Sequence, residues 1–208
     1  MLMDKINDLR NSEIREVIDK RVEEFNSFKN KTSKEIFSEM CFCFMTANFS
    51  ANGGIKIQNA VGEGFFVLPE DLLAFQLKTL GHRFPNARAR FVVEARRYMN
   101  NIKDILEEFK SDFERREFLV KNVKGLGYKE ASHFLRNIGY GDAAIIDFHI
   151  IDLLVKENLV ERPKSKSLTK NKYLEIENVL RDLSDKTGIG LGELDLYLWY
   201  METGKILK

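Results

Sequence analysis

The sequence has few residues of the kinds that hold a fold together through disulfides or metals. Among its 208 residues, two are cysteine, three are proline and one is tryptophan. Cys41 and Cys43 lie in the apolar run CFCFM, which predicts buried free thiols. Their number excludes a disulfide framework and any zinc or iron–sulfur site with four cysteines. No apolar run approaches the roughly 18 residues of a membrane span, and no secretory segment begins the chain, so we expect an intracellular protein without membrane association.

Charge is also close to balanced. The formal net charge is +1, which gives no general preference for an acidic or a basic partner. One segment is locally basic: between residues 78 and 103, seven lysines and arginines accompany a single acid, Glu94. Solvated helix faces and nucleic-acid surfaces both produce such runs, so this segment permits DNA binding without demonstrating it.

Helical periodicity dominates the chain, and no long alternating pattern predicts a strand. The composition, with 44% hydrophobic and 31% charged residues, is that of a globular protein. Pro69 and Pro85 each stand where a helix begins, while the stretch 51–54, ANGG, predicts a break. We therefore expect an all-α fold of about ten helices, without internal repeats.

A glycine-containing turn joins two of these helices. Residues 123–130 read VKGLGYKE, between a helix expected over about 112–120 and another that starts near Tyr128. A turn of this pattern forms a helix-hairpin-helix, whose bare backbone and following helix start can bind DNA phosphates through N–H groups. Val123, Gly125 and Gly127 are the candidates for this contact. The alternative is a helix C-cap followed by a glycine needed for close packing.

Lys129 is unusual in its position, two residues after Gly127 in the first turn of the second helix. The positive end of the helix dipole opposes protonation there, which would lower the pKa of the amine, and partial burial would act in the same direction. A neutral amine is what Schiff-base formation requires. The alternative is an ordinary exposed lysine.

Eighteen residues further on, Asp147 stands between aliphatic residues just before another helix, in the segment IIDFHII. An N-cap aspartate explains this placement. A carboxylate held next to a reacting sugar also explains it, because such a group stabilises positive charge and assists proton transfer. A carboxylate near Lys129 would raise the pKa of the amine while the helix end lowers it, and the sequence does not decide which effect is larger.

Together these residues resemble the helix-hairpin-helix-GPD superfamily of DNA glycosylases. The hairpin, the lysine just inside the next helix and the later Asp-x-His segment carry the similarity, which is most specific over Gly125–His149. Within that superfamily the chain is most similar to the archaeal-type 8-oxoguanine DNA glycosylase/AP lyases. The resemblance implies two helical subdomains with the active site in the cleft between them. We expect one subdomain to comprise about 1–82 and 187–208, and the other about 83–186, with the hairpin at about 112–138.

The resemblance also implies a chemistry. Lys129 would attack C1′ of a flipped-out nucleotide, expel 8-oxoguanine and form a Schiff base, after which β-elimination nicks the strand. Asp147 would support the lysine, and His149 would bind a phosphate near the lesion, unless it is only a core or capping histidine. His133, one turn after Lys129, is expected to be structural. No metal or organic cofactor is implied.

The sequence indicates the residues of the base pocket less clearly than the catalytic residues. Trp199 is a candidate for stacking on the base, although a lone tryptophan in an apolar helix is more often a core residue. Phe84 is a second candidate, for stacking or for filling the space that the base leaves. The resemblance suggests that the main-chain carboxylate of Lys208 accepts hydrogen bonds from the guanine edge. The acceptor that would bind N7–H of 8-oxoguanine, and so reject guanine, is not identified.

The expected partner is double-stranded DNA containing 8-oxoguanine, bound by a monomer in the cytoplasm or on the nucleoid. Two alternatives stay open at this point. The chain could be a glycosylase for another damaged or mispaired base, or a DNA-binding module of the same fold that lacks catalysis.

Overall fold

A computed structural model of the chain describes residues 2–165 and 167–208. Within these ranges the secondary structure is entirely helical, which confirms the predicted fold class. The N-terminal half contains α1 (Leu2–Arg10), α2 (Ile14–Ser27), α3 (Ser33–Thr46), α4 (Ala51–Val61), α5 (Gly64–Val67), α6 (Glu70–Thr79) and α7 (Pro85–Ala95). The remainder contains α8 (Ile102–Glu107), α9 (Asp112–Asn122), α10 (Tyr128–Asn137), α11 (Phe148–Lys156), α12 (Lys170–Thr187) and α13 (Leu191–Thr203). Two short 3₁₀ helices, Phe28–Asn30 and Arg96–Tyr98, follow α2 and α7.

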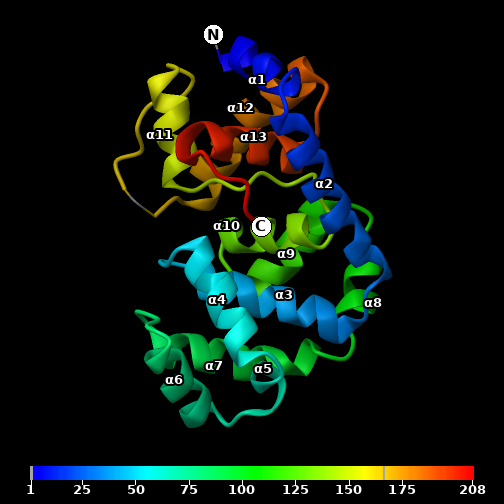
Figure 1. Cartoon of the computed structure of the whole chain (residues 1–208), viewed down its shortest axis with the longest axis vertical. Coiled ribbons are helices and arrows are strands. Elements are labelled where there is room, and N and C mark those ends of the chain that lie inside the picture. The colour runs from blue at the N-terminus through cyan, green and yellow to red at the C-terminus, as the bar shows by residue number, and fades with distance from the viewer. Residues whose placement is uncertain (1, 166) are drawn as a thin grey trace.

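Two clusters of buried side chains form the core. One is built by residues between Ile36 and Ile138, from α3 to α10. The other combines α1 and α2 with the segment from Ala144 to Leu198. In Figure 1 these clusters correspond to a lower and an upper half, α2 connects the two along one side, and the C-terminus lies between them next to α10.

These clusters group the chain differently from the subdomains 1–82 with 187–208 and 83–186. The N-terminal helices α1 and α2 pack with α12 and α13, whereas α3–α6 share a core with the hairpin helices α9 and α10. We therefore propose that the subdomain boundaries lie near residues 30 and 140. Hydrophobic patterns identify which face of a helix is buried, but they do not identify the helix that covers it.

The break expected at residues 51–54 is wrong, because these residues form the first turn of α4. The Ser50 side chain caps this helix by accepting a hydrogen bond from the backbone N–H of Gly53 at 3.0 Å. Gly54 is a packing residue: a Cβ there would lie 2.8 Å from Thr46 Cγ2 on α3. The glycine therefore allows two helices to approach closely instead of ending one of them.

Cys41 and Cys43 are both free and fully buried on α3, as the apolar run predicted. Burial raises the pKa of both thiols far above the usual value. No helix in the described ranges combines the length and apolarity needed to cross a bilayer.

Candidate active site

The hairpin is formed by α9, the turn 123–127 and α10. A capping box of Ser111 and Glu114 starts α9, and Val123 ends it. Val123 and Leu126 are buried in the lower core, so the turn is anchored by side chains that point inward. Gly125 has φ +93°, a conformation that favours glycine, and Gly127 precedes α10 in extended geometry.

The backbone of the turn differs from residue to residue in what it can donate. The N–H of Val123 donates to the Leu119 carbonyl at 2.9 Å, so Val123 offers no free donor and serves as an anchor. The N–H groups of Gly125 and Gly127 have no hydrogen-bond partner in the described chain. No side chain caps α10 either, which leaves the N–H groups of its first turn available. The turn and the start of α10 thus carry free N–H groups of the kind that can bind an anion, while the DNA contact itself stays a prediction.

Lys129 lies in this first turn and is half-buried. Its charge influences three buried groups: it opposes protonation of His133, favours ionisation of Asp195, and favours ionisation of the Cys43 thiol. The Lys129 charge therefore acts on groups of α3, α10 and α13. The Lys129 side chain forms no ion pair within 4 Å in the part of the chain that the structure describes.

Asp147 is the N-cap of α11, and its Oδ1 accepts a hydrogen bond from the Ile150 N–H at 3.0 Å. The N-cap explanation is thus correct. It does not exclude the catalytic one, because a cap that uses one carboxylate oxygen leaves the other free. Asp147 and Lys129 are not in direct contact, but both act electrostatically on Asp195, which lies on α13.

Asp195 connects the upper half to α10. Its Oδ2 lies 2.5 Å from Arg136 Nη1. Burial raises the pKa of the Asp195 carboxyl to about 6, Arg136 and Lys129 counteract this, and Asp147 adds to it. Sequence analysis did not identify Asp195, although an acid within the apolar run Leu194–Leu198 is a signal that could have found it.

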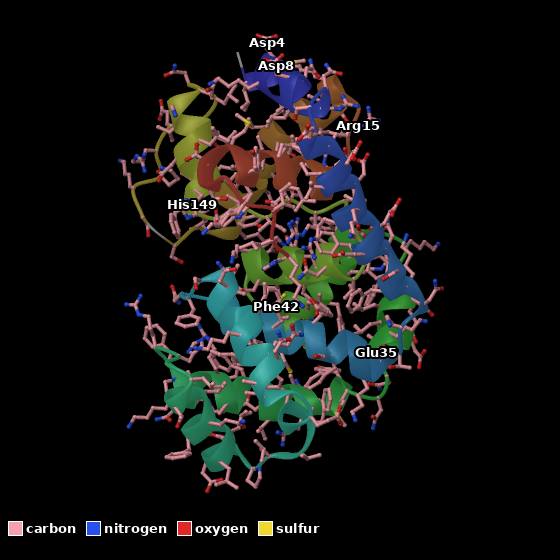
Figure 2. The ribbon with its side chains drawn as sticks, viewed as in Figure 1. Asp4, Asp8, Arg15, Glu35, Phe42 and His149 are labelled. Atoms are coloured by element: carbon pink, nitrogen blue, oxygen red, sulfur yellow. The ribbon has the colours of Figure 1, made fainter. Side chains whose placement is uncertain are left out.

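His149 and Trp199 lie together. Their rings meet edge to face with centroids 4.9 Å apart, and the centroid of the Phe148 ring lies 4.2 Å from that of the His149 ring. Both His149 and Trp199 are half-buried, while Phe148 is 67% exposed. Figure 2 shows His149 in the upper half and Phe42 on α3 in the lower half. Trp199 is therefore neither a fully buried core residue nor free of contacts.

Phe84 precedes α7 and is 45% exposed, so its ring is available for contact. The Arg83 and Arg88 guanidinium groups lie 5.8 and 6.0 Å from this ring. The charge of Glu130, next to Lys129 on α10, acts on the Arg88 guanidinium group. The helix α7 therefore lies near the start of α10. Two arginines of the basic segment serve the fold instead: Arg88 donates to the Ala47 carbonyl and Arg96 to the Leu68 carbonyl, at 2.7 and 2.6 Å.

The last residue, Lys208, is held against the lower core. Its ammonium group donates to Glu39 Oε1 at 2.6 Å and to Gln58 Oε1 at 2.7 Å. The Phe42 ring links Lys208 to His133, one turn after Lys129: its centroid lies 4.4 Å from the Lys208 ammonium group and 5.7 Å from the centroid of the His133 ring. Burial lowers the pKa of His133 well below its usual range, and Arg136 and Lys129 lower it further, so the imidazole is neutral.

Lys129, His133 and Lys208 thus lie on the side of the lower core. Asp147, His149 and Trp199 lie on the side of the upper half. In the described residues, no group of three His, Cys, Asp or Glu side chains is arranged to hold a metal ion. An all-helical fold with a half-buried lysine at the start of the second hairpin helix, after a turn with free N–H groups, is the arrangement expected of DNA glycosylases of the helix-hairpin-helix class.

Comparison with known proteins specifies the family. The family model described as 8-oxoguanine DNA glycosylase matches residues 18–189. The chain is 56% identical over 208 residues to the 8-oxoguanine DNA glycosylase/AP lyase of Methanocaldococcus jannaschii, with 100% of both chains covered. It is 43% identical over 198 residues to the enzyme of the same name from Thermotoga maritima, with 94% of each covered. The chain therefore belongs to the 8-oxoguanine DNA glycosylase/AP lyase family.

Solved structures agree with this assignment. The M. jannaschii glycosylase/lyase in complex with a 15mer DNA containing 8-oxoguanine has a TM-score of 0.96 and 56% identity, and all of both chains is covered. The T. maritima 8-oxoguanine DNA glycosylase has a TM-score of 0.92 and 42% identity, with 100% of this chain and 98% of that chain covered.

Proposed function

We propose that this protein excises 8-oxoguanine from double-stranded DNA and then nicks the strand as an AP lyase. Full-length similarity to glycosylase/AP lyases supports the activity. The observation that carries the mechanism is Lys129, a half-buried amine in the first turn of α10, directly after a hairpin with free backbone donors. A DNA-binding module without catalysis has no need of a half-buried amine at this position.

The reaction begins with the damaged nucleotide flipped out of the duplex, because C1′ cannot be reached within the base stack. The Lys129 Nζ lone pair forms a bond to C1′ as the bond from C1′ to the base breaks, and the base leaves with that electron pair and takes up a proton. Opening of the sugar ring converts the adduct to a Schiff base. The loss of a C2′ proton then expels the 3′ phosphate, and water releases the lysine.

Asp147 supports the first step. With Oδ1 bound to the Ile150 N–H, its second oxygen stabilises the positive charge that develops at C1′. The carboxylate is oriented before the substrate arrives because the cap bond holds it. This is a role for which a rigid helix terminus is better suited than a loop.

The remaining predicted residues bind the DNA. We assign the strand backbone to the N–H groups of Gly125, Gly127 and the start of α10, with His149 at a neighbouring phosphate. Trp199 and Phe84 provide aromatic faces for the flipped base or for the gap that it leaves. The Lys208 carboxylate accepts hydrogen bonds from the guanine edge. We further propose that the protein acts as a monomer, on the nucleoid.

A strand-nicking assay tests this function. Duplex oligonucleotides carrying one 8-oxoguanine, one oxidised pyrimidine or no lesion are incubated with the protein, and the cleaved strand is resolved. We expect nicking at 8-oxoguanine that leaves a 3′ unsaturated aldehyde. Nicking at the pyrimidine lesion alone would assign the chain to another substrate, and binding without nicking of any duplex would reduce it to a DNA-binding module.

A further inference from the structure

A chain of buried polar groups crosses the interface between the two cores. It begins with the ion pair of Asp195 and Arg136, whose atoms Oδ2 and Nη1 are 2.5 Å apart. Arg136 donates from Nε and Nη2 to Asn137 Oδ1 at 3.2 and 3.0 Å. Asn137 Nδ2 then donates to Glu39 Oε2 at 3.3 Å, and the other oxygen of Glu39 receives the ammonium group of Lys208 at 2.6 Å. The chain therefore connects α13, α10 and α3 to the last residue.

Glu39 is the centre of this arrangement. Its side chain is 5% exposed, and Glu39 directly precedes the apolar run 40–45 of α3. A buried carboxylate is costly unless it is paired, and Glu39 has three donors: Asn137, Gln58 Nε2 at 3.1 Å, and Lys208. Only Lys208 brings a positive charge into direct contact. The charge of Glu39 therefore explains why the Lys208 side chain turns inward.

This anchor determines where the chain end lies. The Lys208 ammonium group is 4.4 Å from the centroid of the Phe42 ring, and that ring meets the edge of the His133 ring at 5.7 Å. His133 is four residues after Lys129, so the anchored terminus lies beside the turn of α10 that carries the reactive amine.

We propose that Glu39 is a positioning residue for recognition of the base: by holding the Lys208 side chain on α3, it sets the position of the terminal carboxylate in the base pocket. This inference rests on the proposed function. Glu39 is covered by its three donors and does not itself contact DNA. It follows that Glu39 is needed for removal of the base, but not for strand cleavage at a site from which the base has already gone.

The test compares wild-type protein with Glu39→Gln, which keeps the shape of the side chain and removes its charge. Single-turnover rates are measured on a duplex with 8-oxoguanine and on the same duplex with a preformed abasic site. We expect the rate on 8-oxoguanine to fall about ten- to hundredfold, the cost typical of a misplaced recognition group, and the abasic rate to change less than about twofold. An equal loss on both substrates, or no loss on either, would overturn the proposal.

A double-mutant cycle shows whether Glu39 acts through Lys208. Lys208→Met removes the ammonium group and retains the terminal carboxylate, and should give the same selective loss. The double variant should be no slower than the slower single variant, because both changes release the same anchor. Losses that multiply would mean that Glu39 acts elsewhere. If Glu39→Gln does not fold, the selective loss in Lys208→Met decides the matter alone, since an unselective loss there contradicts the anchor.

Glu157→Gln is the matched control. It removes a carboxylate at the C-terminal end of α11 that is paired with Lys5 of α1 at 2.5 Å, and it should behave as wild type on both substrates. The measurements on wild-type protein distinguish failure of this inference from failure of the proposed function. Wild-type protein that cleaves the abasic duplex but leaves 8-oxoguanine in place would refute the substrate assignment, whereas the anchor fails only through the comparison of variants.

Discussion

The two hairpin glycines have different reasons to be glycine, and alanine substitutions separate them. Gly125 has φ +93°, and a Cβ built there lies 2.6 Å from Phe91 Cγ and still closer to Cδ2. The left-handed conformation costs roughly 1–2 kcal/mol for alanine, and overpacking against a ring costs about 1–3 kcal/mol more. Gly125→Ala should therefore lower the free energy of unfolding by about 3 kcal/mol, which is roughly 6–12 °C in Tm for a chain of this length.

Gly127 has no such requirement. Its φ is −88°, which alanine adopts freely, and the nearest atom to an added Cβ is Glu130 Oε2, at 3.3 Å on the end of a flexible side chain. Gly127→Ala should leave Tm unchanged or slightly higher. Gly127→Ala should weaken only DNA binding, because the variant loses one hydrogen bond to a phosphate. The loss of a hydrogen bond of about 1.5 kcal/mol lowers the affinity roughly tenfold.

Thermal unfolding and titration of a fluorescent duplex with both variants provide the assay. Unfolding of Gly125→Ala at the wild-type temperature would contradict the first expectation, and DNA binding by Gly127→Ala as tight as that of the wild type would contradict the second. The first result would mean that the turn relaxes without cost. The second would mean that the strand does not approach this part of the backbone.

Three further predictions concern buried groups. The two cysteines should react with a maleimide only as fast as the protein opens, because burial keeps both thiols protonated; labelling at the rate of a free thiol would contradict this. Glu177→Ala leaves the fully buried Arg116 guanidinium without its carboxylate partner and should lower the free energy of unfolding by about 3–5 kcal/mol. Loss of the exposed Glu175, on the same helix, should cost less than about 1 kcal/mol in chemical denaturation. Because the pKa of Asp195 rises from 3.8 to about 6 on folding, the native state holds a proton between those values that the unfolded state has lost. The free energy of unfolding of wild type, relative to Asp195→Asn, should fall as the pH rises from 3.8 to about 6 and then level off; a flat difference would show that the carboxyl is not perturbed.

Local features were predictable from the sequence because their causes are local. The hairpin, the lysine in the first turn of α10 and the aspartate before α11 depend on residues a few positions apart, and the structure places each in its predicted element. The two buried thiols follow from a single apolar run.

Features that depend on contacts between distant segments were not predictable. Glu39 and Asp195 are both buried acids next to apolar residues, and their partners Lys208 and Arg136 are 169 and 59 residues away. The pairing of α1 and α2 with α12 and α13 has the same origin. The glycines of α4 were misread because a close helix contact and a helix break call for the same residue.

Covalent trapping of the lysine intermediate tests directly whether Lys129 is the nucleophile. Protein is mixed with a duplex carrying a single 8-oxoguanine in the presence of borohydride, which reduces a Schiff base to a stable amine. We predict a protein–DNA adduct with wild type, its loss in Lys129→Gln, and a peptide map that places the DNA remnant on Lys129. An adduct that persists in Lys129→Gln would show that another amine is the nucleophile, and its absence from wild-type protein would contradict the lyase mechanism altogether.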